Sequence, residues 1–572
     1  MTKEKLSLRR PGASPGILLV LPALIAFTFV VWLPLLGTVS LSFFDWDILT
    51  PPKWVGIENV VRLMKDHFFW KHAGNTIFMS IGNMVCIFLV PLLLSLLALK
   101  TSRKGRGRFT TVYFLPIALT ILPVATFIIW RWMFNPDFGL VNFALSKFGI
   151  RGPEWLSSTI WAKPAGILLF LCQFMPVWIG LALIVYRAYW KGMESKEHKA
   201  VTFRTVTFLF LVMTLPASLG CFEGGYIMTG GGPAGATTTI LYYIYNNAYQ
   251  WFKLGYAAVV SVLPIIFSLI LGIIIWRVTE KQSLRIVLID KNEETKKQQG
   301  TRKLNIILTL IALITIAPAV VPFLWAFLTA IKQPGDVFTY PLKFIPQIPC
   351  WENFSKAWSL VPMGRFYINS IIKTCGILIF QIPIAFLAAY SISVLRIPGR
   401  KAIFFLITAT MLIPAALIQL PIFVVIRQLN LIDSHVALII PYIAWGFGVF
   451  AFKIFFDGFS EKISKARAKG MTEGKVFKKL VLPSSWPIIF GMSAFSLFLS
   501  WGEFGLPLIV TNKMGAKTLP IGLASFQGLH TTDWTLLMAG AILTAIPASL
   551  LFLVILLLLR RPLFNRLAIT RK

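Results

Sequence analysis

The sequence predicts an all-α membrane protein with about twelve transmembrane helices, and three observations support this fold class. First, 57% of the 572 residues are hydrophobic and only 13% are charged, whereas soluble domains average about a quarter charged residues. Second, apolar stretches long enough to cross a bilayer as helices recur from end to end, most clearly at 16–44, 76–99 and 537–559. Third, basic residues cluster in alternate connections between these stretches. Both chain ends are therefore expected in the cytoplasm.

The first apolar stretch follows Lys3, Lys5, Arg9 and Arg10, as the core of a signal peptide would. It is longer than such a core, and no small-x-small cleavage site follows it. We therefore expect a retained first membrane span.

The formal net charge is +33, which in a soluble protein would suggest a nucleic-acid partner. Here the basic residues concentrate at 100–108, 281–303 and 560–572, which the positive-inside rule assigns to the cytoplasm. Topology and anionic lipid headgroups explain the excess, so no nucleic-acid partner is expected.

The chain reads as two related halves, 1–280 and 304–572, joined by a cytoplasmic linker at 281–303. Ile57-Glu-Asn in the first half matches Trp351-Glu-Asn in the second, and Asn75-Thr matches Asn369-Ser. Six spans in each half give both the same orientation, so the repeat is parallel and can enclose a path.

Little in the sequence indicates an enzyme or a bound cofactor. The five cysteines have no paired spacing, and the five histidines lie in or beside connections, so no metal site is predicted. The segment 470–476 lacks the spacing of a phosphate loop, and the glycine-rich segment 229–237 is expected to be a flexible turn outside the cell. ATP would therefore bind a separate protein.

Two acidic residues, Glu223 and Glu503, lie in apolar surroundings near the outer end of the fifth span of each half. Equivalent positions in two repeats would face each other, which suits a sugar path because sugar rings stack on aromatic side chains. Alternatively, both acids lie at the outer water interface beside an aromatic belt. The residues of this possible substrate path are Phe222, Glu223, Tyr226, Trp501, Glu503 and Phe504.

A long basic connection follows the fourth span of the second half, from 453 to 483. Ser460 can cap a helix over 461–468, which Gly470 would end. Such a helix either lies on the membrane surface or docks a partner.

At this point the sequence resembles the inner-membrane permease subunits of carbohydrate ABC importers over nearly its whole length. The first half resembles the maltose-F-type subunit and the second the maltose-G-type, as if the pair were fused. The motifs that carry the resemblance are Thr229-Gly-Gly-Gly-Pro, Phe477-Lys-Lys-Leu-Val-Leu-Pro, Ser500-Trp-Gly-Glu-Phe and Asp533-Trp-Thr-Leu-Leu-Met-Ala-Gly. The resemblance implies a type I ABC importer permease fold in the bacterial cytoplasmic membrane.

The resemblance also implies that a cytoplasmic loop in each half seats in an ATPase subunit. The residues assigned to these loops by the resemblance are Met193 and Glu194 in the first half, and Ser464, Ala466, Gly470, Phe477 and Pro483 in the second. Ser464, Lys465 and Lys469 stand where Glu and Asp would be expected in the family, so the loop has become basic.

The leading hypothesis is a permease that imports a carbohydrate, with two ATPase subunits beneath it and an extracytoplasmic solute-binding protein above it. One alternative is a twelve-span secondary carrier driven by an ion gradient. Another is a scaffold that binds an ATPase without transporting, which the altered coupling loops suggest.

Overall fold

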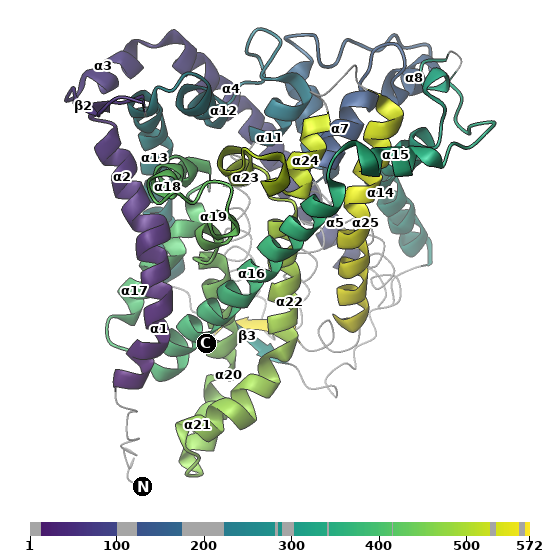
Figure 1. The fold of residues 1–572 in the computed structure, drawn as a ribbon. Helices are drawn as coiled ribbons and strands as arrows, with labels where there is room; N and C mark the ends of the chain where they lie inside the picture. The colour runs from purple at the N-terminus through teal and green to yellow at the C-terminus, as the bar shows by residue number, and fades with distance from the viewer. Residues whose placement is uncertain are drawn as a thin grey trace.

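The computed structural model describes residues 13–47, 49–99, 123–173, 222–280, 284–288, 302–339, 342–414, 416–526, 533–559 and 567–571. The first-half coupling residues Met193 and Glu194 lie outside these ranges. Within them the chain is mostly helical, as predicted, and the long helices run roughly parallel between an upper and a lower end of the molecule (Figure 1).

The first half begins with one long span, Pro15–Leu41, which confirms the predicted first crossing. Its parts, and the elements that follow up to the linker, are α1 (Ala13–Phe27), η1 (Thr28–Trp32), α2 (Leu33–Leu41), β1 (Phe44–Asp45), β2 (Lys53–Trp54), α3 (Glu58–Lys65), α4 (His67–Met84), η2 (Val85–Leu89), α5 (Val90–Leu99), α7 (Pro123–Met133), α8 (Leu140–Ser146), α11 (Phe222–Gly224), η4 (Gly225–Thr229), α12 (Ile240–Tyr245), η5 (Asn246–Gln250) and α13 (Leu254–Glu280).

The second half repeats this plan of long helices joined by short ones. Its elements are α14 (Arg302–Ala330), η7 (Pro334–Asp336), α15 (Glu352–Leu360), α16 (Met363–Tyr390), η8 (Ser391–Leu395), α17 (Arg400–Ala409), η9 (Thr410–Leu412), α18 (Ala416–Gln428), α19 (His435–Ile439), η10 (Ile440–Tyr442), α20 (Gly446–Ala468), α21 (Glu473–Lys475), η11 (Val476–Val481), α22 (Leu482–Trp501), α23 (Gly505–Val510), η12 (Met514–Ala516), α24 (Leu519–Ser525) and α25 (Trp534–Leu559).

Five helices of the described ranges are long and apolar enough to cross a membrane, and two bent helix pairs bring this number to seven. The bent pairs are Arg400–Leu412 with Ala416–Gln428 and His435–Tyr442 with Gly446–Ala468. Many large apolar side chains on these helices are exposed, such as Phe29, Ile77 and Ile379, and a lipid environment would cover them. The total of about twelve spans stays a prediction.

The helix α16 forms the centre of the second half. Of the most apolar window of its span, Met363–Leu395, 61% is buried inside the protein, against 33–39% for the other four long spans. It packs against α1, α20, α22 and α24, and Figure 1 shows it crossing the middle of the molecule. Polar groups on α16 are therefore inside the protein, away from lipid.

Matching hydrogen bonds in the two halves tie the end of the first span to the short outer helix that follows. Asn59 on α3 donates through Nδ2 to the carbonyls of Ser42 and Phe44 at 3.1 and 2.9 Å. Asn353 on α15 donates in the same way to Ala330 and Lys332, both at 2.8 Å. One amide nitrogen thus satisfies two carbonyls beyond a helix end, which explains the shared Glu-Asn motif.

A second matching set joins the start of the second span to a distant loop. Asn75 donates to the carbonyls of Gly235 and Thr238 at 2.9 and 3.0 Å, and Asn369 donates to those of Gly515 and Lys517 at 2.8 and 2.9 Å. The neighbouring hydroxyls of Thr76 and Ser370 accept from the first backbone N–H of α12 and α24, at 2.8 and 2.9 Å. The sequence repeat therefore corresponds to a repeat of contacts.

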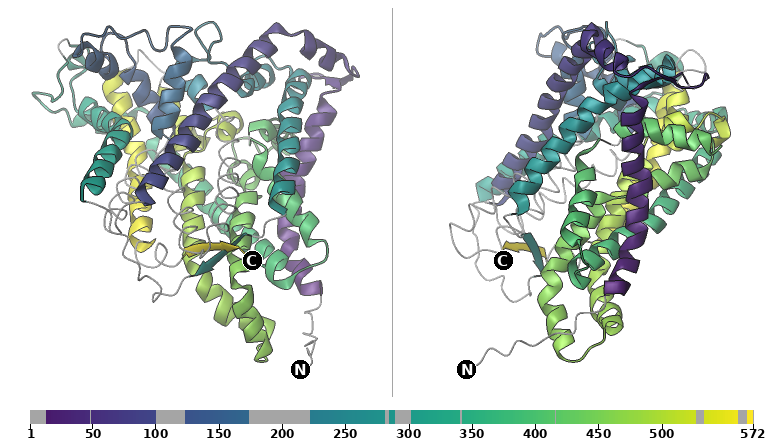
Figure 2. Two further views of the ribbon diagram at one scale, coloured as in Figure 1. Left: turned by 180° about the vertical axis from the view of Figure 1, so that it is seen from behind. Right: turned by 90° about the vertical axis from the view of Figure 1, so that its left-hand side faces the viewer.

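Two features differ from the predicted all-helical chain. Short antiparallel sheets are present, β1 with β2 and β3 (Leu284–Leu288) with β4 (Leu567–Arg571). The second sheet joins the predicted linker to the C-terminal tail, and Figure 2 shows this pair beside the lower part of the helices.

The predicted cap at Ser460 is wrong, because α20 runs unbroken from Gly446 to Ala468. Phe455, Phe456, Phe459 and Ile463 are buried on one side of α20, so the apolar face continues through the position where the sequence suggested a new helix. The end near Gly470 is confirmed, since Gly470 has φ +77°.

Candidate functional site

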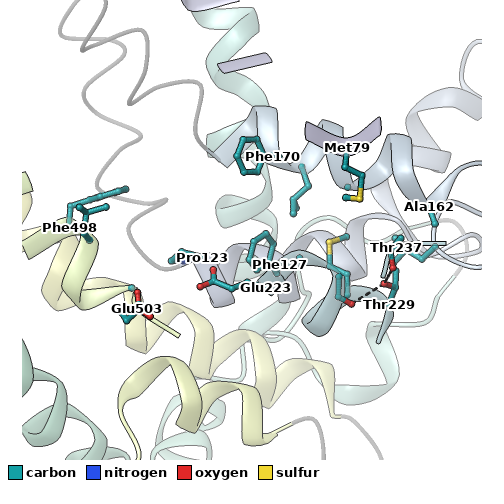
Figure 3. Close-up of a pocket in the computed structure, with 18 residues that line it drawn as sticks. Met79, Pro123, Phe127, Ala162, Phe170, Glu223, Thr229, Thr237, Phe498 and Glu503 are labelled. Carbon is teal, nitrogen blue, oxygen red and sulfur yellow. Dashed lines mark hydrogen bonds between the residues drawn. The ribbon is translucent and has the colours of Figure 1, made fainter. Parts of the chain in front are cut away.

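A cavity of about 340 Å³ lies between the two halves of the chain (Figure 3). Both halves contribute described residues to its wall, most of them apolar. The lining residues are Met79, Pro123, Phe127, Leu156, Ala162, Gly166, Leu169, Phe170, Glu223, Gly224, Gly225, Met228, Thr229, Thr237, Phe498, Leu499, Gly502 and Glu503. An apolar wall with a few polar groups is typical of a small-molecule site.

The two acids singled out in the sequence, Glu223 and Glu503, both line this cavity. Glu223 lies on the short helix α11, and Glu503 lies in the turn between α22 and α23. The Glu503 Oε1 accepts from the N–H of Leu506 at 3.4 Å, which holds this carboxylate at the start of α23.

The four aromatic residues predicted beside these acids do not line the cavity. Phe222 packs on Tyr226 with ring centroids 5.4 Å apart, and Tyr226 contacts Phe504 of the second half at 5.8 Å. Trp501 and Phe504 are buried, with 4% and 0% of their surfaces exposed. The contact between Tyr226 and Phe504 therefore joins the two halves next to the cavity.

The aromatic rings that do line the cavity are Phe127, Phe170 and Phe498. Sequence reasoning missed them because each lies within an ordinary apolar stretch, where nothing distinguishes a cavity-lining ring from one that faces lipid. Met79 could have been found, since it lies one helical turn after Asn75 on the same face of α4.

The glycine-rich loop beside the cavity is a turn, as predicted, and hydrogen bonds connect it to itself and to α4. The hydroxyls of Thr229 and Thr237 lie 2.6 Å apart, and Thr237 also donates to the carbonyl of Gly232 at 2.9 Å. Lys71 donates to Ala234 at 2.7 Å, in addition to the bonds from Asn75. The loop is thereby fixed to α4, and Thr229 and Thr237 present their side chains to the cavity.

At the lower end of the molecule, Gly470 ends α20 with the backbone pattern of a glycine C-cap. Its N–H donates to the carbonyl of Arg467 at 2.9 Å, and the N–H of Met471 donates to Ala466 at 3.2 Å. No atom lies within 4 Å of a Cβ built on Gly470, so its positive φ is the reason that glycine is needed.

An arginine clamp, which the sequence did not reveal, closes this loop. The Arg467 guanidinium donates to both oxygens of Glu473, at 2.6 and 2.8 Å, and to the carbonyl of Val394 at 3.4 Å. Val394 lies in η8 at the lower end of the α16 span. The clamp therefore connects the loop to the central helix of the second half.

The aromatic end of the predicted coupling segment reinforces that connection. Phe477 packs against Tyr390 and Phe386 of α16, with centroids 5.1 and 6.3 Å apart. Pro483 lies in the first turn of α22, which continues directly from η11. Ser464 and Ala466 lie on the last turns of α20, so all five second-half residues belong to one structural unit.

No group of three or more His, Cys, Asp or Glu side chains in the described ranges is arranged to hold a metal ion.

Comparison with known proteins gives a family match in the second half. Residues 381–565 match the family described as "Binding-protein-dependent transport system inner membrane component". The matched residues contain the Arg467 clamp, Gly470, Phe477 and Glu503. The match begins inside α16, so Asn369 lies before it.

Curated relatives align with two fifths to one half of the chain. The sn-glycerol-3-phosphate transport system permease protein UgpE of Yersinia pestis is 29% identical over 258 residues, 44% of this chain and 92% of its own. The sulfoquinovosyl glycerol transport system permease protein SmoH of Agrobacterium fabrum is 27% identical over 42% of this chain and 86% of its own. The probable ABC transporter permease protein YurM of Bacillus subtilis is 28% identical over 41% and 78%.

A solved structure of a bacterial ABC transporter involved in alginate import aligns with 44% of this chain and 95% of its own, with 19% identity and a TM-score of 0.39. This score is too low to bear on the arrangement of the helices.

Proposed function

We propose, on the premise that residues 381–565 form an inner-membrane component of a binding-protein-dependent transport system, that the whole chain supplies both permease halves of one ABC importer. Its relatives are named as permease proteins of transport systems and as a probable ABC transporter permease, and this chain is a multi-pass membrane permease of the same kind. The finer proposal is that 1–280 and 304–572 are the two permease units and that 281–303 is a cytoplasmic linker.

The observation that carries the proposal for both halves is the repeat of contacts. The paired amides Asn75 and Asn369 make the same two hydrogen bonds in their respective halves. The family match covers only the second half, but the same contacts in the first half support a second unit of the same plan. The cavity between them is then the point where a solute would pass.

The proposed solute is a carbohydrate or a related molecule with several hydroxyl groups. The names of two relatives refer to sn-glycerol 3-phosphate and to sulfoquinovosyl glycerol. Three aromatic rings in the cavity wall can stack on a sugar ring, those of Phe127, Phe170 and Phe498. The carboxyl oxygens of Glu223 and Glu503 can accept hydrogen bonds from the hydroxyl groups of the solute.

The energy source in this proposal is ATP hydrolysis by two separate ATPase subunits, which alone bind the nucleotide. One of them would contact the α20–α21 loop around Gly470. The Arg467 clamp and Phe477 join this loop to α16, so a push on the loop reaches the central helix of the second half, which packs against the cavity-lining helix α22. The segment that contains Met193 and Glu194 is proposed as the first-half docking site.

An extracytoplasmic solute-binding protein is the proposed source of the solute, in keeping with the family description. It would dock at the end of the molecule that carries α3, α8 and α15 (Figure 1). Both termini are then cytoplasmic. Alternation between outward and inward access would follow from relative movement of the two halves around the cavity.

Reconstituted uptake tests this proposal. The full chain is placed in liposomes together with the ATPase and the solute-binding protein encoded beside its gene, and uptake of radiolabelled maltose, glycerol and sn-glycerol 3-phosphate is measured. We expect uptake of at least one of these solutes, and only when ATP is present on the side of the membrane where the ATPase is bound.

Two outcomes would replace the proposal by one of its alternatives. Uptake without the ATPase, driven by a proton or sodium gradient, would show a secondary carrier. Firm ATPase binding with neither uptake nor stimulated hydrolysis would show a scaffold.

A further inference from the structure

Two short helices at the upper end of the molecule, α3 and α15, each present an exposed apolar side that the transport proposal does not use. On α3 the side toward the protein carries Asn59 and Leu63, which are buried. The charged residues Glu58, Arg62 and Lys65 lie three or four positions apart and share a second side. A third side, by the same spacing, consists of exposed apolar residues. They are Ile57, Val60, Val61 and Met64.

The helix α15 repeats this three-sided pattern. Counted from the matching amides Asn59 and Asn353, three exposed apolar positions of α3 correspond to aromatic residues of α15. These are Trp351 for Ile57, Phe354 for Val60 and Trp358 for Met64, while a serine at 355 replaces Val61. Glu352 and Lys356 continue the charged side, and Asn353 and Ala357 are buried on the side toward the protein.

The apolar sides are exposed to a similar extent in the two halves. Met64 has 57% of its surface exposed and its counterpart Trp358 has 46%. For Ile57 and its counterpart Trp351 the exposed fractions are 66% and 59%. Single exposed apolar residues are ordinary, but here one whole side of a helix is exposed at matching positions of the repeat. Such a surface marks a contact with a partner.

Each of the two helices is held against the last long helix of its own half. The helix α3 packs against α13, and α15 packs against α25. Figure 1 shows α3 and α15 at opposite sides of the upper end, and the view from behind in Figure 2 shows the same separation. Because the two helices lie apart, their apolar sides do not cover each other.

The apolar side of α15 continues onto two membrane spans. Trp351 and Phe354 pack on Phe327 of the span Thr309–Ala330, with ring centroids 6.1 and 6.4 Å apart. Trp358 packs on Tyr367 in α16, which begins the span Met363–Leu395, at 5.4 Å. All three aromatic residues of α15 therefore contact helices that are apolar enough to cross the bilayer.

The apolar side of α3 is joined to the next span in a similar way. Trp70, in the first turns of the span His67–Leu94, donates through Nε1 to the carbonyl of Met64 at 3.1 Å. Phe68 and Ile77 of the same span are 62% and 60% exposed. Lipid covers the exposed apolar side chains of a span, and indole rings are enriched where the bilayer meets water. The surface that faces lipid on the spans therefore extends to α3 and α15.

We propose that α3 and α15 are interfacial helices whose apolar sides insert among the phospholipids of the leaflet at the upper end of the molecule. A helix with one apolar and one charged side lies in the plane of this interface, with the apolar side toward the acyl chains and the charged side toward water. Each half of the chain then carries one lipid anchor, fixed to its last long helix, that sets how deep this half sits in the membrane. The inference goes beyond the proposed function and does not depend on it, because a chain that transports nothing would carry the same anchors.

Photocrosslinking of the full chain tests both anchors. The photoreactive residue p-benzoylphenylalanine replaces Met64 or Trp358 on the apolar sides. In the matched controls it replaces the next residue, Lys65 or Ser359, which is also exposed but lies on another side of the helix. Each variant is irradiated in vesicles of phosphatidylethanolamine and phosphatidylglycerol, and in parallel in intact cells. Mass spectrometry of the peptide with the photoreactive residue measures the fraction that carries the mass of a phospholipid.

We expect this fraction to be about fivefold or more higher at positions 64 and 358 than at positions 65 and 359, because only the first two side chains face lipid. The same difference is expected in cells. The two halves should agree with each other, because the pattern is the same in both.

Equal phospholipid fractions within the pairs, or no phospholipid at position 64 or 358, would overturn the anchors. Crosslinks from positions 64 and 358 to a soluble protein or to a second copy of this chain, in place of phospholipid, would also overturn them and would assign the surface to that partner. Uptake does not enter this test, so its outcome and that of the reconstituted uptake experiment are separate.

Discussion

The Arg467 clamp gives the sharpest test of how the lower loop is connected to the membrane helices. In Arg467→Gln the two bonds to Glu473, 2.6 and 2.8 Å long, and the bond to the carbonyl of Val394 are lost. Exposed ion pairs contribute about 0.2–1 kcal/mol, and hydrogen bonds to charged groups contribute about 1.5–3 kcal/mol. The two side chains are 24% and 34% exposed, so we place the clamp at about 1–2 kcal/mol.

That free energy corresponds to a change of about fivefold to thirtyfold in the population of the closed loop. If the loop transmits the ATPase movement to α16, ATP-dependent uptake per permease should fall by a similar factor. The level of the variant in the membrane should remain that of the wild type. Reconstituted uptake, normalised to the amount of inserted protein, measures the effect.

The matched control is Lys356→Gln, which removes an exposed ion pair with Glu352 on the outer helix α15. Uptake by this variant should stay within about twofold of the wild type. The exchange of Arg467→Glu with Glu473→Arg restores the ion pair and should recover part of the loss. Wild-type uptake in Arg467→Gln, or a loss no greater than in the control, would refute the clamp as a coupling element.

Three further predictions concern the loop, the repeat contacts and the outer surface. Gly470→Val should destabilise the loop by about 1–2 kcal/mol because a side chain is strained at φ +77°, and should reduce ATP-dependent uptake; Gly474→Val, at an ordinary helical φ with open space around it, should not, and equal uptake in both would contradict this role of glycine. Asn369→Leu leaves two carbonyls unpaired and should cost about 2–4 kcal/mol of stability, visible as a lower thermal unfolding midpoint in detergent; an unchanged midpoint would show that the repeat contact contributes little. At Asp66, outside the spans, burial alone would raise the pKa of the carboxyl, but hydrogen bonds from Tyr243, Tyr256 and backbone amides outweigh it and lower the pKa below the ordinary value of 3.8. The depressed pKa stabilises the fold above pH 4 and this contribution is lost as the pH falls through the lowered value, so Asp66→Asn should flatten the acid limb of a stability profile; a limb as steep as that of the wild type would contradict this.

The parts of the fold that could be predicted from sequence are those with a local chemical signature. The length of the first apolar stretch predicted the first span. The glycine after the last helical residues predicted the helix end at Gly470, where the structure has the positive φ that glycine tolerates best. The Glu-Asn and Asn-Ser motifs indicated a repeat, because asparagine at these positions makes two backbone contacts in each half.

The candidate site was only half predictable. Glu223 and Glu503 stood out because acids are costly in apolar surroundings, and both line the cavity. The rings beside them in sequence pack between the halves, while the rings that line the cavity come from helices far apart in the chain. Which ring faces a cavity depends on tertiary packing, and no local pattern records it.

The buried Lys373 lies in an otherwise apolar helix, and its sequence signal is the internal repeat, in which Lys373 follows Asn369 by the same spacing as Met79 follows Asn75. The β3–β4 pair was missed because it joins two segments that are almost three hundred residues apart, each judged as a polar connection on its own.

Sidedness tests the account most directly, because an importer of this kind needs its ATPase loop and its solute entrance on opposite faces. Single cysteines at Lys469, beside Gly470, and at Ala234, in the glycine-rich loop, can be probed in intact cells with a reagent that does not cross membranes. The account predicts that the cysteine at 234 reacts in intact cells and that the one at 469 reacts only after the membrane is opened. Reaction of both cysteines from the same side, or the reverse pattern, would contradict it.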